Sequence, residues 1–346
     1  MKPLFHPMLV NDAFGDPGLY VDCLFDKCAL LFDLGDIRAL AARKLLRLTD
    51  VFVSHTHMDH FMGFDWLVRV CLGRPRALRL YGPPGFLAQV EHRLAAYTWN
   101  LVQNYEADFT LEVLEAHPDG SAQRAAFHCK RGFQRQDEEA LTLHAGILRE
   151  EEGFRVRAAF LDHKTACLGF ALEENQHLNV WKNKLDELGL PPGPWLQEFK
   201  HAVRRGLPPE TRFRAWWRAD GRTHERWFAL GALEATALRI VPGQKLAYVT
   251  DVVYHEANAA RIVELARGAD ALYIEAPFLE QDAERAAAKY HLTAAQAGRL
   301  ARAAGVKSVV PFHFSPVYHD RGAALRAEVE RAFAGPGAPC NTGAGK

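Results

Sequence analysis

The stretch Ser54-His55-Thr56-His57-Met58-Asp59-His60 follows directly on the apolar run Val51–Val53. It places three histidines and one aspartate within six residues, on what the pattern predicts to be a tight loop leaving a buried strand. Imidazole nitrogens and carboxylate oxygens are the ligands that a borderline-soft divalent ion such as zinc accepts. A solvated polar loop is the alternative, but four polar side chains at one strand end would all need partners. The stretch therefore predicts a metal site.

The spacing of these donors divides them into two pairs. His55 and His57 alternate to the same side of an extended backbone, so they can bind one ion together. Asp59 and His60 follow on the turn and can reach a second ion. We therefore expect a dinuclear centre, which needs further ligands from elsewhere in the chain.

Three later residues have the chemistry of metal ligands: His163, Asp251 and His313. Each follows a short apolar run that we expect to be a strand. Taken singly, a histidine in such a place is more often a hydrogen-bonded loop residue. Strand ends on one edge of an α/β sheet converge, however, so the three residues together with the first loop predict a complete site.

Length and composition are those of an ordinary globular protein. The chain has 346 residues, of which 49% are hydrophobic and 24% charged, so it can bury a sizeable core. No apolar run is long enough to cross a bilayer, and the N-terminal sequence lacks the apolar stretch of a signal peptide. We therefore expect no membrane association.

Short apolar runs and helix-like segments follow one another along the chain, which predicts a layered α/β fold. The runs expected to be strands are 29–32, 51–53, 78–81, 155–161, 168–172, 246–249, 271–274 and 308–311. The segments expected to be helices are 37–46, 86–97, 258–266 and 294–304, with Thr293 as the cap of the last.

Cysteine usage and charge indicate the compartment and limit the partners. The six cysteines, at positions 23, 28, 71, 129, 167 and 340, include no Cys-x-x-Cys pair. We interpret them as free thiols in a reducing cytoplasm. The basic and the acidic residues both number 42, so the formal net charge is zero. Binding of nucleic acid would therefore depend on local patches.

Residues 175–230 form one such patch and depart from the α/β pattern. After a Gly/Pro-rich run, eight Lys and Arg residues are opposed by four acidic residues between Trp195 and Phe228, and seven Trp and Phe residues are interleaved with them. We interpret this segment as an inserted basic and aromatic arm, because such a mixture suits a phosphate backbone with exposed bases. The alternative is a solvated insertion whose tryptophans pack on the main body.

Taken in order, the ligand positions resemble the five motifs of the metallo-β-lactamase superfamily. Asp33, in the sequence LLFDLG, resembles the first motif, and residues 55–60 the second. The third, fourth and fifth correspond to His163, Asp251 and His313. The resemblance implies one metallo-β-lactamase-like domain over residues 1–346, a four-layer αβ/βα sandwich of two mixed β-sheets with outer helices.

The same resemblance implies a role for each motif residue. One zinc would be held by His55, His57 and His163. The other would be held by Asp59, His60 and His313, with Asp251 bridging the two. Asp33 would support the metal loop from behind without binding the metal. Manganese or iron could occupy a His/Asp site of this type as well.

Within the superfamily the chain most resembles ribonuclease Z, the endonuclease that trims the 3′ end of precursor tRNA. The sequence FHFSPVY at 312–318 resembles the His-Phe-Ser-x-Arg-Tyr ending of that family. EAPF at 275–278 and HLTAAQA at 291–297 resemble its Glu-Ala-Thr-Phe and His-x-Thr-x-x-x-Ala segments. LGLPPGP at 188–194 resembles the Gly/Pro-rich run before the arm that grips tRNA.

The chain also departs from that family. Its N-terminus lacks the glycine-rich opening, and the usual Ser-Gly-Asp-Thr around the bridging aspartate reads Val-Thr-Asp-Val at 249–252. Val317 stands where the family often has arginine, which removes one phosphate contact.

We infer catalytic and substrate-binding roles from the site and from this resemblance. Asp59, positioned by its own metal bond, would orient the nucleophile and accept its proton. By resemblance, His291 would donate a proton to the leaving oxygen, and Glu275 would keep His291 cationic. The residues expected to contact substrate are Lys200, Arg204, Arg205 and Ser315. The resemblance further implies a homodimer in which the arm of one subunit serves the active site of its partner.

Three functions remain open on the sequence alone. The leading one is a zinc-dependent phosphodiesterase acting on RNA, an endoribonuclease that produces the 3′ end of tRNA with a metal-bridged hydroxide. The second keeps the metal chemistry but hydrolyses a small phosphodiester, a cyclic nucleotide or another ester, which Val317 and the zero net charge favour. The third is a non-catalytic scaffold that binds nucleic acid. The complete ligand set argues against it, because a scaffold needs no open coordination position.

Overall fold

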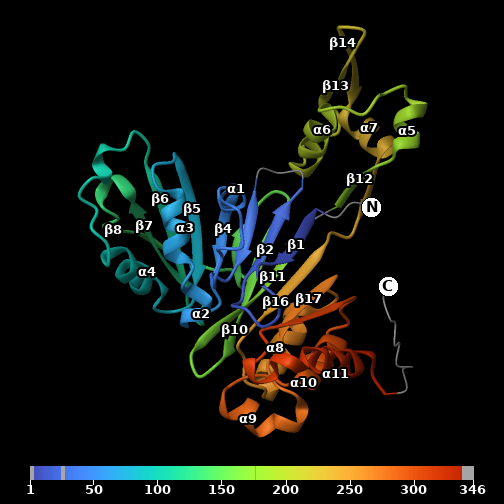
Figure 1. Cartoon of the computed structure of the whole chain (residues 1–346). Helices are drawn as coiled ribbons and strands as arrows, with labels where there is room; N and C mark the ends of the chain where they lie inside the picture. The colour runs from blue at the N-terminus through green and yellow to red at the C-terminus, as the bar shows by residue number, and fades with distance from the viewer. Residues whose placement is uncertain (1–3, 25–27, 176, 337–346) are drawn as a thin grey trace. The chain divides into compact units, whose positions relative to one another are not determined.

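The computed structural model describes residues 4–24, 28–175 and 177–336 (Figure 1). These residues form two compact units. The larger contains Phe5–Arg149, Val156–Leu172 and the chain from Lys245 onward, and the smaller consists mainly of Glu173–Gln244, joined by Glu150–Arg155. The smaller unit includes most of the segment predicted to be the arm.

The first sheet of the larger unit has eight strands that lie side by side in chain order. They are β1 (Phe5–Leu9), β2 (Leu19–Cys23), β3 (Ala29–Phe32), β4 (Leu48–Phe52), β5 (Arg76–Gly82), β6 (Phe109–Ala116), β7 (Ser121–His128) and β8 (Arg135–Thr142). Strands β3 to β6 are parallel, and the remaining pairs are antiparallel. Helices α3 (Phe64–Cys71) and α4 (Phe86–Ala95) pack on one face of this sheet (Figure 1).

The second sheet has six strands in the order β18-β17-β16-β11-β10-β9. They are β9 (Ile147–Glu150), β10 (Phe154–Asp162), β11 (Ala166–Glu174), β16 (Lys245–Val249), β17 (Ala271–Glu275) and β18 (Val309–Phe312). The last three are parallel. Helices α8 (Glu256–Ala266), α10 (Ala294–Ala303) and α11 (Gly322–Ala334) cover this sheet and share a buried apolar cluster with it.

Aromatic side chains fill the space between the two sheets. The Phe32 ring lies 5.1 Å from Phe52 within the first sheet, and 5.6 Å from Phe170 and 5.9 Å from Tyr248 in the second. Burial of such large rings is the main source of stabilisation in a core of this kind. Helices, sheet, sheet and helices therefore form four layers, which confirms the predicted fold class.

All eight apolar runs that were predicted to be strands overlap a strand of the structure, so these assignments are confirmed. The cap of α10 is also confirmed: the Thr293 side chain accepts from the Gln296 backbone, and the Gln296 side chain bonds back to the Thr293 backbone. The helix predicted over 37–46 is wrong in length, because α1 covers only Ala42–Leu45. The Asp36 carboxylate accepts from the backbone N–H of Arg38, which favours a turn at that point over a helix.

The smaller unit has its own core. Trp195 and Phe199 on α6 (Trp195–Arg204) are fully buried against Leu230 and Leu233 of α7 (Leu230–Ala237). These aromatic rings therefore pack within the arm itself, whereas the Trp227 ring remains half exposed. The unit is completed by α5 (Lys182–Glu187) and by two strand pairs, β12 (His177–Val180) with β15 (Leu238–Val241) and β13 (Arg212–Ala219) with β14 (Arg222–Ala229).

The hairpin β13–β14 presents arginines to solvent. Its turn is Asp220-Gly221, where both residues have positive φ, as a tight two-residue hairpin turn requires. Arg218 and Arg222 flank this turn and are exposed. The tip of the arm is therefore a basic surface.

Two further expectations concern the whole chain. None of the helices described is long and apolar enough to cross a membrane. The cysteines at 23, 28, 71, 129 and 167 are free thiols, and Cys340 lies outside the described residues.

Candidate metal centre

The metal loop begins where β4 ends and the chain turns into the short helix α2 (Met58–Phe61). His57 is the residue before the helix and keeps an extended backbone, while Asp59 and His60 lie in the first turn. His55 and His60 are almost fully buried, whereas the Asp59 side chain keeps 43% of its surface exposed. The loop thus directs buried imidazoles and one accessible carboxylate toward the same place.

Three other site residues lie at strand ends in an unusual backbone conformation. Asp33 follows β3, Asp251 lies just beyond β16, and His313 follows β18, with φ values of 61°, 46° and 58°. Non-glycine residues rarely adopt this left-handed region, and the strain is typically found at functional sites. The sharp turns bring the side chains back over the ends of the sheets.

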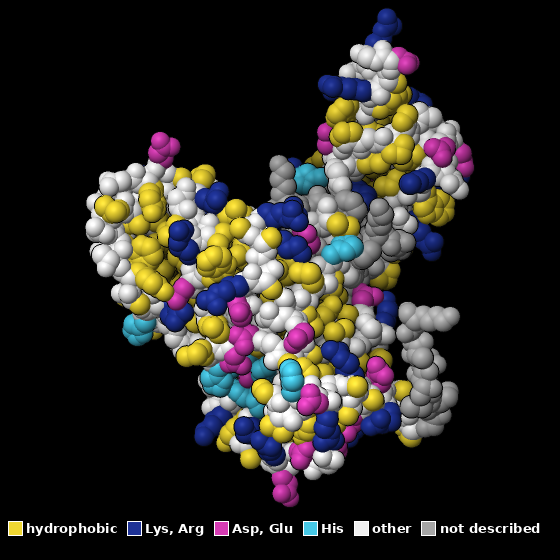
Figure 2. All heavy atoms as spheres, in the orientation of Figure 1, with side chains coloured by type: hydrophobic (Ala, Val, Ile, Leu, Met, Phe, Trp, Pro, Cys, Tyr) yellow, Lys and Arg dark blue, Asp and Glu magenta, His cyan; other side chains and the backbone are white. Residues whose placement is uncertain are grey.

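The structure brings all seven predicted ligands together. One group of donor atoms comes from His55, His57, His163 and Asp251, and a second from Asp59, His60 and His313. Asp251 joins the two groups. Its Oδ2 lies 3.2 Å from Nε2 of His163, and its Oδ1 lies 2.9 Å from Nδ1 of His313. Figure 2 shows histidine side chains gathered beside acidic ones on one face of the molecule.

Unpaired buried nitrogens show that these residues fit metal ions. The Nε2 atoms of His55 and His60 and the Nδ1 atom of His313 are buried without a hydrogen-bond partner. Buried polar atoms are nearly always satisfied, so unpaired imidazole nitrogens facing carboxylates call for another electron-pair acceptor. A set of imidazoles and carboxylates is a donor set for zinc and similar divalent ions.

The electrostatics of the site agree with binding of divalent metal ions. Burial, together with the charge of His60, lowers the pKa of His55 to about 2, so the His55 imidazole is neutral and can act as a ligand. Burial opposes ionisation of Asp251, yet the nearby His313 and His60 lower its pKa well below the usual range. Burial likewise opposes ionisation of Asp59, but the neighbouring His313 and His60 outweigh it and lower that pKa.

Buried hydrogen bonds hold the ligands in place from behind. The Asp33 carboxylate lies 2.9 Å from Nδ1 of His60, and it accepts from the Ser54 backbone N–H at 2.6 Å and from the Tyr248 hydroxyl at 2.9 Å. Nδ1 of His163 lies 2.8 Å from the Tyr290 carbonyl oxygen, which leaves Nε2 for the centre. Such contacts fix the ring orientation of a metal ligand.

Glu275 and His291 form a pair at the edge of the centre. Nδ1 of His291 lies 2.8 Å from Oε2 of Glu275, while the other carboxylate oxygen accepts from the backbone N–H groups of Val252 and Leu292. Burial opposes the charged form of both residues, but their attraction for each other outweighs it. His291 lowers the pKa of Glu275 to about 2, and Glu275 raises the pKa of His291. Donor atoms of both residues lie within 4.8 Å of those of Asp251 and His313.

The residues expected to contact substrate lie in different places. Lys200 and Arg204 are on α6 of the arm, where burial and the adjacent Arg204 lower the pKa of Lys200. The Arg204 side chain is only 15% exposed and lies 3.9 Å from Glu174, whereas Arg205, at the end of the helix, is exposed. Ser315 is half-buried two residues after His313, and its backbone N–H donates to the Pro277 carbonyl.

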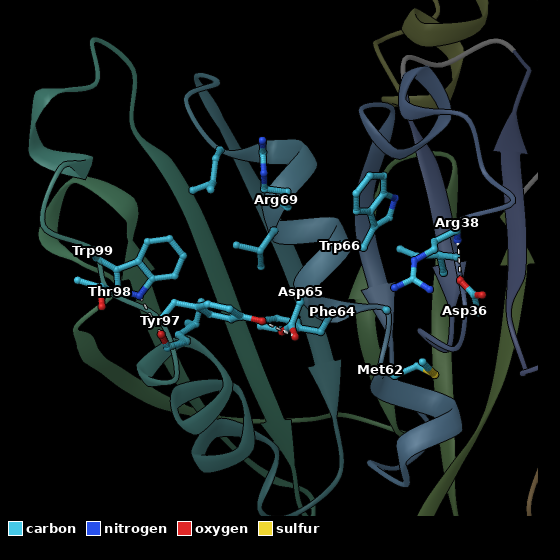
Figure 3. Close-up of a pocket in the computed structure, with 15 residues that line it drawn as sticks. Asp36, Arg38, Met62, Phe64, Asp65, Trp66, Arg69, Tyr97, Thr98 and Trp99 are labelled. Atoms are coloured by element: carbon cyan, nitrogen blue, oxygen red, sulfur yellow. Dashed lines mark hydrogen bonds between the residues drawn. The ribbon is translucent and has the colours of Figure 1, made fainter.

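Sequence reasoning missed the residues that act on the ligands through long-range contacts. Tyr248 and Tyr290 lie far from Asp33 and His163 along the chain, so their hydrogen bonds leave no local pattern. It also missed a cavity of about 530 Å³ beside α3 and α4, with Trp66, Tyr97 and Trp99 in its walls (Figure 3). None of the predicted metal ligands lines that cavity.

Comparison with known proteins identifies the class. A family model described as a beta-lactamase superfamily domain matches residues 19–180 and 219–314, which is most of the chain. The chain therefore belongs to the β-lactamase superfamily, as its two sheets and the converging ligands indicate.

Comparison with curated proteins narrows this assignment. A ribonuclease Z of Deinococcus radiodurans is 33% identical over 295 residues, covering 84% of this chain and 83% of the relative. A ribonuclease Z of Methanosarcina acetivorans is 28% identical, covering 88% and 84%. Within the superfamily the chain belongs to the ribonuclease Z family, and it is a metal-dependent endoribonuclease.

Solved structures share the fold. The metallo-beta-lactamase fold protein YhfI from Bacillus subtilis superimposes with a TM-score of 0.53 at 15% identity over 95% of each chain. The short form of human tRNase Z superimposes with a TM-score of 0.51 at 16% identity, covering 91% of this chain and 93% of that one.

Replacing Asp33 by Asn should weaken metal binding about 10- to 100-fold, because the amide cannot hold His60 and the Ser54 backbone as the carboxylate does. The measurement is a competition titration of zinc against a chelator. Asp50→Asn is the matched control, since Asp50 is equally buried but pairs with Arg79 and is not among the donor groups. Equal loss of zinc affinity in both variants would contradict the role of Asp33.

If His291 donates the proton to the leaving alkoxide, as the family resemblance implies, replacing it by Ala should lower RNA cleavage about a hundredfold or more. Hydrolysis of bis(p-nitrophenyl) phosphate should change far less, because p-nitrophenolate leaves without being protonated. The measurement compares kcat/KM for both substrates in the same zinc-loaded preparation. An equal loss on both would show that His291 acts by holding the centre together.

Proposed function

We propose that this endoribonuclease removes the 3′ trailer of precursor tRNA. One observation carries the proposal: the seven ligand positions form two groups that Asp251 connects, and a Glu275–His291 pair reaches the same cluster. The site thus combines a place for two cations with a separate proton donor. The relatives named ribonuclease Z and the fold shared with human tRNase Z support tRNA as the substrate.

We further propose zinc as the metal, with manganese or iron as alternatives for the same donors. Two such ions supply an activated water near neutral pH and neutralise charge on the phosphate oxygens. His55, His57 and His163 would hold one ion, and Asp59, His60 and His313 the other. Asp251 would serve both, since each of its oxygens faces one of the two groups.

The chain itself supplies the proton transfers. Asp59 is the one carboxylate of the donor groups that is substantially exposed, so it can orient an attacking water and accept its proton. His291 uses Nδ1 to bond Glu275, which leaves Nε2 to protonate the leaving oxygen. The buried Glu275 carboxylate favours the cationic form of His291 that this step needs.

The arm would hold the RNA. Arg205 and the exposed arginines of the β13–β14 hairpin provide positive charge in a chain whose net charge is zero. Counterion release makes such contacts a strong and salt-dependent source of affinity for a polyanion. We propose that the protein works as a cytoplasmic homodimer, in which the arm of one subunit serves the active site of its partner.

A second function keeps the same chemistry on a small phosphodiester. Val317 favours it, because this side chain is 58% exposed shortly after His313, at a place where the family often has arginine. An apolar residue there offers no charge to a neighbouring phosphate of a polymeric substrate. The two functions differ in substrate length, which can be tested directly.

The deciding experiment is cleavage of a 3′-extended precursor tRNA by the purified protein with added zinc or manganese. We expect one cut after the discriminator base, and we expect Asp59→Ala to abolish it, because the variant lacks both a metal ligand and the proton acceptor. Bis(p-nitrophenyl) phosphate is assayed beside it. Turnover of this small diester without specific cutting of the tRNA would reject tRNA processing and leave the second function.

Reversing two charges at the tip of the arm, Arg218→Glu with Arg222→Glu, should raise KM for precursor tRNA about tenfold or more at low salt. Hydrolysis of bis(p-nitrophenyl) phosphate should not change, since the metal centre is intact. The control is Arg43→Glu with Arg302→Glu, which changes the net charge equally on exposed residues of the larger unit. If both double variants raise KM alike, the effect is one of overall charge and the arm has no special part.

A further inference from the structure

Lys164 is the one basic residue that directly neighbours a predicted metal ligand along the chain. It follows His163, and no other Lys or Arg stands within two residues of any of the seven ligand positions. The two residues lie in the tight turn that joins β10 to β11 (Figure 1). His163 is buried at the centre, whereas Lys164 is exposed. Neighbouring side chains of one turn thus belong to the inside and to the surface of the site.

The backbone of this turn is strained and held by hydrogen bonds. Lys164 has a φ of 62°, in the left-handed region that non-glycine residues rarely occupy. Its backbone N–H donates to the Asp162 carboxylate at 2.8 Å, and the N–H of His163 donates to the Thr165 carbonyl at 3.1 Å. Such a conformation persists only where the surrounding structure fixes it, so the Lys164 side chain leaves the backbone in a defined direction.

Tyr290 contacts both His163 and Lys164. Its carbonyl oxygen lies 2.8 Å from Nδ1 of His163, and the Lys164 ammonium lies over its ring, 5.5 Å from the ring centroid. A cation within about 6 Å of an aromatic face is attracted by the quadrupole of the ring. Tyr290 also has a left-handed backbone, with a φ of 62°. One residue therefore orients a metal ligand through its backbone and a cation through its ring.

These contacts place the ammonium group at the rim of the metal centre, on the side of His291. The His291 ring lies 4.9 Å from the ring of His163 and 5.7 Å from that of His313, so it adjoins one ligand of each group. Lys164 follows His163 along the chain, and Tyr290 precedes His291. A phosphodiester bound at the two metal sites would therefore extend its neighbouring nucleotides past this rim.

The Lys164 ammonium has no carboxylate partner among the residues that the structure describes. The carboxylate of the nearby Asp162 accepts from the Lys164 backbone and lies 3.5 Å from Nε2 of His255. Lys307, in contrast, forms an ion pair with Asp270 at 2.6 Å. The charge of Lys164 is thus not neutralised by the protein, and it is available to an anionic group of the substrate.

We propose that Lys164, positioned by the Tyr290 ring, binds a non-bridging oxygen of a phosphate that flanks the scissile phosphodiester. The inference rests on the proposed cleavage of an RNA chain, and it names a residue that distinguishes a polymer from a small diester without a flanking phosphate. It also supplies a positive charge near the centre in place of the one that is absent at Val317. Lys164 and Tyr290 both lie in the larger unit, so this contact is separate from the arm.

Binding of a single-stranded RNA of about twelve nucleotides tests the contact without an assay of cleavage. Fluorescein-labelled RNA is titrated with the zinc-loaded protein at several concentrations of KCl. One phosphate contact contributes about 0.7 to the slope of log K against log salt for a single strand, so Lys164→Gln should reduce the slope by about that amount. The same variant should weaken binding about fivefold or more at low salt. Lys164→Arg keeps the charge and should retain the slope of the wild-type protein.

Lys44→Gln is the matched control. The Lys44 ammonium also lies over a tyrosine ring of the larger unit, 4.9 Å from the centroid of Tyr20. Its helix α1 precedes β4, whereas the metal loop follows that strand, so Lys44 should have no part in the contact. The control should therefore keep the wild-type slope. An unchanged slope in Lys164→Gln, or an equal change in both variants, would overturn the proposal.

Cleavage of precursor tRNA then identifies the phosphate. A neutral methylphosphonate is placed at the phosphate on one side of the cleavage site or on the other. At one of these positions it should lower kcat/KM about tenfold for the wild-type protein but less than about twofold for Lys164→Gln, since the partner of that phosphate is already missing. Losses that multiply at both positions would show that Lys164 contacts neither phosphate, which would overturn the proposal.

Tyr290→Leu tests the positioning role of the ring, because the backbone carbonyl that contacts His163 is kept. It should lower kcat/KM about threefold in the wild-type protein and add nothing in Lys164→Gln. An equal loss in both backgrounds would show that the Tyr290 ring acts independently of Lys164. A protein that cuts no precursor tRNA, but whose slope for single-stranded RNA still depends on Lys164, would reject the proposed function and leave the phosphate contact standing.

Discussion

The site depends on one buried carboxylate, that of Asp33. It accepts from the Ser54 backbone and hydroxyl, it lies 2.9 Å from His60, and it accepts from Tyr248 of the other sheet. A polar group without partners would be costly at this depth, and the four contacts offset that cost. Because the contacts come from both sheets, the same bonds that satisfy the carboxylate also fix the metal loop against the second half of the fold.

Backbone strain at the strand ends follows from the same requirement. Asp33, Asp251 and His313 each adopt a left-handed backbone conformation that costs of order 1–3 kcal/mol. A strand that simply continued would point its next side chain away from the centre. The turn redirects each side chain toward the other ligands. The packing of the rigid sheets on both sides offsets the free energy of the strained backbone. The stable aromatic core between the sheets is therefore a condition for the geometry of the site.

Much of this could be predicted where the information is local. The metal loop holds four donors within six residues, and the strand β3 is apolar at every position, so both are visible in short windows. The antiparallel strands β6 to β8 were not predicted, because they carry no long apolar run. The hydrogen bonds of Tyr248 and Tyr290 could not be predicted for another reason: they join residues more than 100 positions apart, and only the folded chain brings these residues together. The arm was visible as a composition, but its internal core around Trp195 was not.

The charged residues of the chain are distributed unevenly, so that different regions carry different local charge. Three carboxylates, those of Asp59, Asp251 and Glu275, meet at the metal centre and would repel a phosphodiester unless cations balanced them. The arm concentrates exposed arginines that would attract a polyanion, whereas the cavity beside α3 and α4 is lined by two arginines and two aspartates around aromatic rings. The net charge of zero is thus the sum of regions that differ in local charge. Attraction of a polyanionic substrate can therefore be local to the arm even though the chain as a whole is neutral.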